Sequence, residues 1–393
     1  MAMAPLATTA QSNAVPSPIG GLNTRDSVDL LPETDAIRLD NFFPARSHVQ
    51  VRNGYDDHVT GLPSSVESLM VYNSGTASTM FAASGTAVYN VTSAGSVGSA
   101  VITSLTNARF QSVNMTTSGG SFLFICNGAD APRHWNGSSW ATPTLGSVTA
   151  ANIINVEVYK ERLFFVLKDS LTYGYLPVNA VAGTVASVNL GSVFSKGGKI
   201  MAIATWTRDG GAGPDDNILF FTDQGEIAMY SGTDPSDATK WGLVGVYTVG
   251  RPIGHRCMLK VGSDCYLVTE NGLLPMTQVL GTGEAAPNVA LSDKISSSYN
   301  SSVVEFKGTF GWQGVVYPKG GYAAVNAPSS TVGDFIQYII NLETGAWSRF
   351  TNQNAYVWAV FNSDLYFGGN TKVHKADSGT DDSGSAIEAV AKT

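Results

Sequence analysis

Short apolar segments that recur at near-regular intervals constrain this chain more than any other feature of its sequence. Each copy holds an apolar segment, a turn and a second apolar segment that ends in Gly, Asn or Asp. Seven copies are recognisable, or six if one is wrongly divided, and successive second segments lie 41 to 57 residues apart. These second segments begin near Met80, Phe122, Leu163, Ile218, Cys265, Tyr322 and Leu365. Repeats of roughly 40–50 residues with about four strands each are typical of a β-propeller.

The details of the copies agree with this interpretation. The two longest intervals contain loop-like insertions, at 208–216 and 281–300, and no helix of three turns is expected anywhere. The segment LFFV (163–166) is apolar on consecutive residues, which suits a sheet that neighbouring blades cover on both faces. Three tryptophans late in their units are expected to pack between blades: Trp140, Trp241 and Trp347.

We therefore predict an all-β fold, a β-propeller of about six or seven blades with an extended N-terminal arm. A stack of β-sandwich domains, which also uses short strands at regular spacing, is the alternative. We assign residues 1–19 to a flexible tail and 20–60 to an arm or docking segment. Residues 61–380 are the propeller, and 381–393 are a C-terminal strand or the start of a further segment.

Composition limits the classes of partner. Charged residues make up 14% of the 393 residues, against about 25% in typical soluble domains. The formal net charge is −8 and the basic residues do not cluster, so we expect no tight nucleic-acid-binding patch. The three cysteines are widely spaced and are interpreted as small buried hydrophobes. No apolar run approaches the ~18 residues of a membrane span, so none is expected.

No motif of a known reaction centre is complete. The segment GSVFSKGGKI (191–200) has neither the spacing nor the hydroxyl residue of a phosphate-binding P-loop. The five histidines never pair at the spacing of zinc ligands, and the acidic loops lack the alternating ligands of a calcium loop. We therefore expect no catalytic residue, no cofactor and no metal.

Acidic residues keep one enzymatic alternative open, because propellers can hydrolyse glycans when two carboxylates meet at the central channel. Only Asp223 and Glu270 occupy matching places, each just after an inner strand, and turn formation explains both equally well. The carboxylates considered are Asp215, Asp216, Asp223, Glu226, Glu270 and Glu284.

The most individual stretch lies before the repeats, at residues 20–55. It contains a Gly-Gly-Leu-Asn opening, an acidic linker, the block DAIRLDNFFP and the close RNGY. This pattern resembles the start of tail hub or nozzle proteins, of the tail tubular or DNA-stabilisation type, from short-tailed bacteriophages. The later segment VHKADSGTDDSGSAI resembles the end of the propeller in the same family. The matching residues are Gly20, Gly21, Leu22, Asn23, Pro32, Asp35, Ala36, Leu39, Asn41, Phe42, Phe43, Pro44, Arg52, Gly54 and Tyr55.

The resemblance implies a structural virion protein and not an enzyme. Such proteins form a ring, usually of six subunits, that encloses the DNA ejection channel. The implied partners are copies of the same chain in a homohexamer, the tail adaptor protein, tail fibres or spikes, and phage DNA that passes without sequence-specific binding. The implied location is the phage tail of the virion, after synthesis in the cytoplasm of the host bacterium. An acidic or neutral ring channel would let DNA slide.

The arm is the interface that this reading predicts, because its apolar and charged residues suit a joint between subunits. The segment HVQVRNGY (48–55) alternates and is expected to supply the outer strand of the last blade. The alternative for the arm is that it only caps its own domain. The functional alternatives are a propeller that binds or cleaves glycans and a general interaction propeller. The expected interface residues are Leu22, Asn23, Arg25, Asp35, Arg38, Leu39, Asn41, Phe42, Phe43, Pro44, Arg52 and Tyr55.

Overall fold

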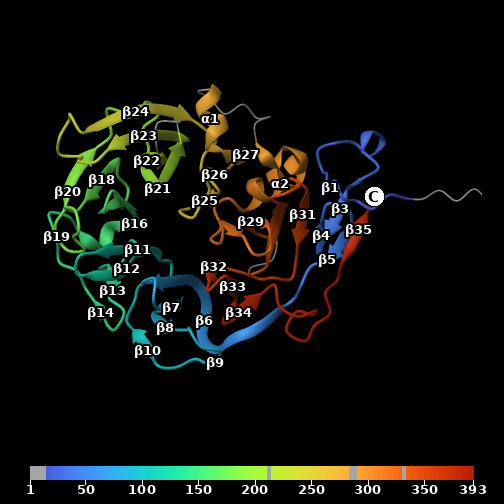
Figure 1. Ribbon diagram of the computed structural model, residues 1–393. Helices are drawn as coiled ribbons and strands as arrows, with labels where there is room; N and C mark the ends of the chain where they lie inside the picture. The colour runs from blue at the N-terminus through green and yellow to red at the C-terminus, as the bar shows by residue number, and fades with distance from the viewer. Residues whose placement is uncertain (1–14, 210–213, 283–289, 330–332) are drawn as a thin grey trace, which may run out of the picture.

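Successive four-stranded antiparallel sheets are arranged around a central axis in the computed structural model (Figure 1). The structure describes residues 15–209, 214–282, 290–329 and 333–393. Three blades are separate four-stranded sheets. They are β11 (Gln111–Thr117), β12 (Gly120–Cys126), β13 (Arg133–Trp135) and β14 (Trp140–Ala141); β16 (Ile153–Tyr159), β17 (Arg162–Leu167), β18 (Thr172–Tyr175) and β20 (Ala186–Asn189); and β21 (Ile200–Asp209), β22 (Pro214–Thr222), β23 (Glu226–Gly232) and β24 (Trp241–Thr248).

One long strand, β6 (Tyr55–Asn73), joins the first blade to the last. Its second half is the inner strand of blade one and pairs from Val66 to Asn73 with β7. Its first half pairs antiparallel with β34, which makes it the outer strand of blade seven. Blade one also contains β7 (Ser78–Ser84), β8 (Ala87–Asn90) and β10 (Ala100–Ile102); blade seven contains β32 (Val357–Phe361), β33 (Asp364–Gly368) and β34 (Asn370–Ala376).

Blades five and six complete the ring. Blade five has three strands among the described residues, and blade six has four propeller strands. They are β25 (Met258–Val261), β26 (Asp264–Thr269) and β27 (Gly272–Pro275), and then β28 (Gln313–Tyr317), β29 (Tyr322–Pro328), β30 (Phe335–Asn341) and β31 (Trp347–Phe350). The described strands therefore form seven blades, and the predicted all-β propeller is confirmed. The alternative of stacked sandwich domains is wrong.

The strand that closes the ring lies later in the sequence than expected. Residues 55–65 of β6 pair with β34, whereas β5 (Val49–Val51) forms a hairpin with β4 (Phe42–Pro44). The prediction that 48–55 supplies this strand is therefore wrong. The reason is local, because a Cβ on Gly54 would lie 1.7 Å from the Asp381 carbonyl oxygen. That close backbone contact holds the chain to the C-terminal loop before the closing strand begins.

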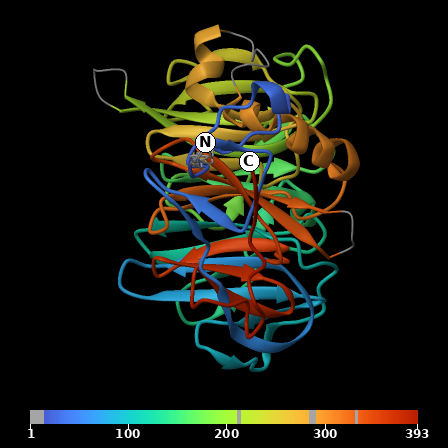
Figure 2. The same cartoon turned by 90° about the vertical axis from the view of Figure 1, so that its right-hand side faces the viewer.

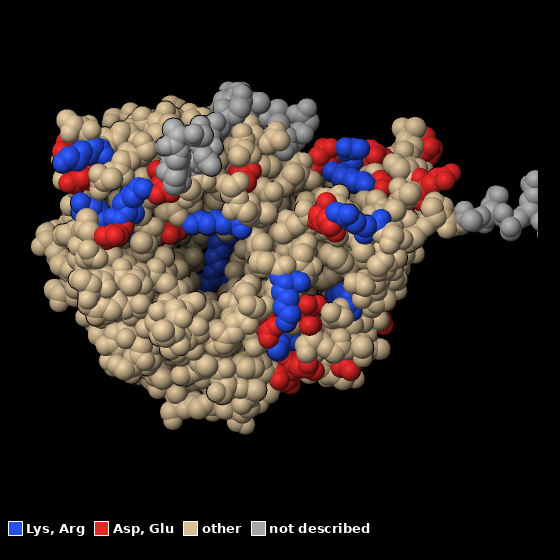
Figure 3. All heavy atoms as spheres, viewed as in Figure 1, with Lys and Arg blue, Asp and Glu red and all other residues tan. Residues whose placement is uncertain are grey.

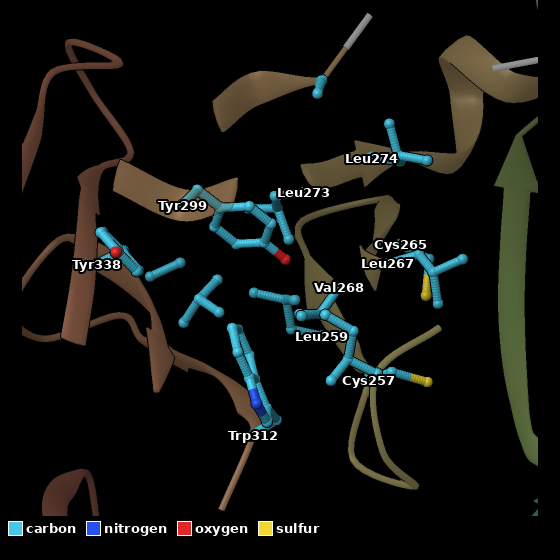
Figure 4. Packing of buried hydrophobic residues seen from close by; sticks show 14 of the residues in the cluster. Cys257, Leu259, Cys265, Leu267, Val268, Leu273, Leu274, Tyr299, Trp312 and Tyr338 are labelled. Atoms are coloured by element: carbon cyan, nitrogen blue, oxygen red, sulfur yellow. The ribbon is translucent and has the colours of Figure 1, made fainter. Parts of the chain in front are cut away.

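Helices follow β27 where a fourth strand was expected, so the prediction of no three-turn helix is also wrong. They are α1 (Met276–Thr282), the 3-10 helix η4 (Leu291–Ile295) and the eleven-residue α2 (Ser296–Phe306). Helix α2 is held by tertiary contacts, since the Tyr299 hydroxyl donates to the Thr269 carbonyl at 2.7 Å. The centroid of the Tyr299 ring lies 6.1 Å from that of the Trp312 ring and 5.9 Å from that of the Tyr338 ring (Figure 4).

The core lies between neighbouring blades. Trp241 stacks on Phe164 of the preceding blade and on Tyr230 of its own, with ring centroids 5.8 and 5.6 Å apart. Trp140 packs against Phe81 at 4.9 Å, and Trp347 is 1% exposed, so the expected packing of these tryptophans is confirmed. All three cysteines are free and buried as expected, and burial raises the pKa of the Cys257 thiol to about 12.

Candidate functional site: the arm seam and the axial channel

The N-terminal arm lies along the outer edge of blade six (Figures 1 and 2). It comprises β1 (Gly21–Leu22), the 3-10 helix η1 (Val28–Leu30), β2 (Asp35–Ala36), β3 (Arg38–Asp40), β4 and β5. Strands β1 and β3 both pair parallel with β31 of that blade. The C-terminal strand β35 (Val390–Lys392) pairs with β3, so both ends of the chain extend blade six. Within the segment 381–393, residues 390–392 thus form a strand that extends blade six and does not close the ring.

The two glycines of the opening motif permit close packing. A Cβ on Gly21, whose φ is +85°, would lie 2.5 Å from the Trp347 carbonyl oxygen. A Cβ on Gly20 would lie 2.1 Å from Oδ1 of Asp35. Any larger residue here would push the arm off blade six. The next residue, Leu22, is 3% exposed and joins the core.

We call the contact surface between the arm and the rest of the chain the arm seam. Asp35 makes the first group of polar contacts in this seam. Asn23 Nδ2 donates to one carboxylate oxygen of Asp35 at 2.9 Å, and Lys294 Nζ donates to the other at 2.8 Å. Lys294 also donates to the Gly20 carbonyl at 2.7 Å, so a residue of η4, just before α2, binds the start of the arm. Arg25 lies at the surface and pairs with Asp26 and Asp293.

Asp40 forms the second polar group. It accepts from Arg349 Nε and Nη2 at 2.7 and 3.0 Å and from Arg38 Nε at 2.6 Å. Desolvation by burial alone would raise the pKa of Asp40, but the hydrogen bonds from Arg349 and Arg38 outweigh it and lower that pKa. Beside it, Leu39 is fully buried.

Asn41 and Arg52 form the third group. Arg52 makes a bidentate pair with Asp382 at 2.8 and 2.6 Å, and their side chains are 1% and 4% exposed. Arg52 Nε donates to Asn41 Oδ1 at 2.9 Å, and Nη2 donates to the Thr351 carbonyl at 3.0 Å. Asn41, at φ +58°, donates from Nδ2 to the Glu388 carbonyl at 2.7 Å. One cluster therefore joins the arm, blade six and the C-terminal segment.

The remaining predicted arm residues make apolar or backbone contacts. Phe43 lies 5.9 Å from the ring of Tyr322, and Tyr55 lies edge-on to Phe367 at 5.0 Å. The Pro44 carbonyl accepts from Asn341 Nδ2 at 2.9 Å. Phe42 is half-buried against the core, and Arg25 and Arg38 are the exposed members of the predicted set.

All twelve predicted arm residues are thus brought together on one seam, and the contacts described are with their own propeller. Contacts between these twelve residues and another subunit remain a prediction. Two apolar residues of the arm, Val28 and Leu30, are 72% and 75% exposed on η1, and neither is among the twelve predicted interface residues. The sequence signal for them is the run VDLL (28–31), which places three apolar residues in an otherwise polar linker.

A second candidate site is the axial channel. A cavity of about 270 Å³ is lined by residues from the inner strands of all seven blades. Its polar wall includes Gln111, Asn155, Glu157 and Gln313. A second cavity, of about 230 Å³, lies at one mouth of this channel and shares Gln111, His255 and Arg256 with it. Figure 3 shows Lys or Arg side chains at the rim and in the depth of the central hollow.

The channel does not bring the predicted carboxylates together. Among the described lining residues of both cavities the one carboxylate is Glu157, whose pKa is raised by burial. The predicted carboxylates bind partners elsewhere. Asp216 contacts Lys160 and Thr207, and Asp223 accepts a hydrogen bond from the Lys199 backbone amide. Glu226 accepts hydrogen bonds from Ser195 and Lys196, and Glu270 pairs with Lys307, whereas the side chains of Asp215 and Glu284 lie outside the described ones. No group of three metal-ligating side chains occurs in the described part of the chain.

Comparisons with known proteins give similarity of fold only. No protein family model matches the chain, and no curated protein matches it. Solved structures that resemble it include YCF48 bound to D1 peptide, at 8% identity and TM-score 0.48, with 82% of this chain and 95% of that chain covered. The WD40 β-propeller domain of Doa1 gives 11% identity and TM-score 0.49, with 82% and 96% covered. BBS1N in complex with ARL6DN gives 11% identity and TM-score 0.49, with 86% and 100% covered. Over the residues that the structure describes, no helix has the length and apolar character of a membrane span.

Proposed function

We propose that the chain is a structural ring subunit of a short-tailed phage tail, of the hub or nozzle type. The observation that supports this most is the arm seam. The residues that carry the resemblance are those that fix the arm to blade six, including Gly21, Asp35, Asn41 and Arg52. The motif therefore corresponds to one coherent structural unit and not to scattered similarity.

A ring subunit needs a rigid body and a contact that repeats by rotation. The interdigitated aromatic residues between blades supply the rigid body. The exposed pair Val28 and Leu30 is a candidate for the repeating contact, because η1 stands away from the seam and its apolar side chains face solvent. Burial of two such side chains would contribute roughly 3 kcal/mol or more to association.

In this proposal the chain assembles with copies of itself as a hexamer, attaches to the tail adaptor and carries fibres or spikes. DNA passes through the opening between subunits without sequence-specific contact. The location is the tail of the virion. The overall charge is −8, and a ring channel with a negative or neutral wall would not retain DNA phosphates.

Glycan cleavage has less support. Retaining and inverting mechanisms both use two carboxylates, separated by about 5 to 10 Å, that flank the scissile bond. The channel wall offers Glu157 as the one carboxylate among the described lining residues, and the Lys260 ammonium near it donates to Thr205 Oγ1 at 2.6 Å.

The proposal is tested by replacing Val28 and Leu30 together with Asp and measuring mass by light scattering after size-exclusion chromatography. The wild-type chain should form a closed oligomer, and V28D/L30D should shift toward the monomer. The matched control is V101D/V178D, because Val101 and Val178 are exposed apolar residues in blades far from the arm, at 41% and 42%. A wild-type chain that stays monomeric at high concentration, with and without its tail partners, would contradict the proposal.

A further inference from the structure

Arg256 is the most unusual charged residue outside the arm seam. It lies between blades four and five and reaches across to blade one. Its Nη2 donates to the Glu67 carbonyl at 2.9 Å, to Ser68 Oγ at 2.8 Å and to the Phe110 carbonyl at 3.0 Å. None of these acceptors is charged. Its Nη1 is buried and has no hydrogen-bond partner among the described residues.

The charges around Arg256 do not balance. The neighbouring guanidinium of Arg109 already binds Glu67 Oε1, at 3.1 and 3.2 Å. Both guanidinium groups lie over the ring of Phe310, with their central carbons 4.3 and 5.4 Å from its centroid. The cluster thus holds two guanidinium groups and one carboxylate. Lys307, which also lines the mouth, pairs with Glu270 outside this cluster.

An unpaired buried charge is costly, and a guanidinium gains most from a charged acceptor that takes hydrogen bonds. Arg256 lines both the channel and the mouth cavity, and so does Gln111. His255 does not supply a further donor there, because its Nδ1 donates to the Met201 carbonyl at 2.6 Å and burial lowers its pKa. The mouth lining contains Arg109, Arg256 and Lys307 and, among the described residues, no carboxylate.

We propose that the mouth of the axial channel binds an oxyanion, a carboxylate or a phosphate group, on Nη1 of Arg256. Gln111 lines the same cavity, and the Arg109 and Lys307 charges attract the ligand. Phe310 closes one side of the cluster. Although burial lowers the pKa of Arg256 to about 10, the group keeps its charge at neutral pH. The site belongs to a single propeller, so it exists whether or not subunits form a ring.

The test is calorimetric titration of the full chain with inorganic phosphate and, separately, with acetate, at constant ionic strength in chloride. Saturable binding of one or both anions is expected, and the two titrations distinguish a phosphate site from a carboxylate site. R256Q should weaken binding at least about tenfold, because it removes a charge-assisted contact. The matched control is R251Q, since Arg251 is exposed in the same connection and its side chain donates to Gln224 Oε1 at 3.0 Å.

Two further variants keep the proposal testable if R256Q fails to fold. E67Q removes the one carboxylate of the cluster and keeps the backbone acceptor of Arg256, so anion affinity should rise several-fold. R109Q releases the Glu67 carboxylate to compete for Arg256, so affinity should fall. An absence of saturable binding by the wild-type chain for both anions, or unchanged affinity in E67Q and R109Q, would overturn the proposal and leave Arg256 as a hydrogen-bonded tie between blades.

Discussion

Arg52 and Asp382 form a buried bidentate ion pair although 330 residues separate them in the sequence. The pair joins the arm to the C-terminal loop, and Asn41 and the Thr351 carbonyl occupy further donors of the same guanidinium. An ion pair that is buried and fully hydrogen-bonded does little for net stability against an apolar substitute, but removal of one partner leaves an uncompensated charge. The arm is thereby held in one position.

The first prediction concerns this pair. R52A should lower the free energy of unfolding by about 3 to 5 kcal/mol, because it leaves the Asp382 carboxylate buried in the seam without its cationic partner. Urea denaturation followed by tryptophan fluorescence measures the change. R46A is the control, since Arg46 and Glu343 form a pair whose side chains are 74% and 56% exposed, and it should change stability by less than about 1 kcal/mol. Equal effects of both variants would show that the seam is not closed in solution.

The second prediction concerns Gly21. G21A should destabilise the chain by about 2 kcal/mol or more, because the new Cβ meets backbone at a positive φ. G98A is the control, since a Cβ there meets nothing within 4 Å and its φ is not positive. Thermal unfolding and limited proteolysis of the arm would be compared. If G21A resists unfolding and protease as well as G98A does, the parallel contact between β1 and β31 is not present.

The third prediction concerns pH. The pKa of Asp40 is lower when folded than its unfolded value of about 3.9, so folding favours the charged carboxylate. Its stabilising contribution is therefore complete above the unfolded pKa and is lost as the pH falls through the folded pKa. The difference in unfolding free energy between wild type and D40N should be constant near neutrality and shrink below about pH 4. A difference that grows on acidification would contradict the arrangement of Arg38 and Arg349 around Asp40.

The fourth prediction concerns blade five. Y299F should cost about 1 kcal/mol, because the Thr269 carbonyl loses a buried hydrogen bond, whereas Y299A should cost about 3 to 5 kcal/mol through the cavity it leaves. Chemical denaturation gives both values. S301A, on an exposed position of the same helix, is the control. Similar values for Y299A and S301A would mean that α2 does not pack on the blade.

Most strands of this fold could be predicted from local sequence patterns, whereas helix α2 and the ring-closing strand depend on distant contacts. Each predicted second strand lies within four residues of an observed one, from β7 to β33, because apolar runs and Gly or Asn turns act locally. Helix α2 was not predicted, because its segment SSSYNSS has weak helix propensity and is held in place by contacts of Tyr299 with residues distant in the sequence. The ring-closing strand was misplaced because Gly54 is fixed by Asp381, which lies far along the chain.

The candidate sites also differ in how far the sequence predicted them. The arm residues were identified as a group because they lie together in the sequence, but their acceptors, such as Trp347, Arg349 and Asp382, lie some three hundred residues away. The sequence alone therefore left open whether they face their own propeller. Arg256 had no signal at all, since its acceptors at 67, 68 and 110 come within its reach only when the whole ring of blades has formed.

Cryo-electron microscopy of the purified chain tests the central proposal most directly. We predict closed rings in which each arm lies on blade six of its own propeller and η1, with Val28 and Leu30, contacts the adjacent subunit. Dispersed single propellers at every concentration, or rings in which η1 faces solvent, would contradict it.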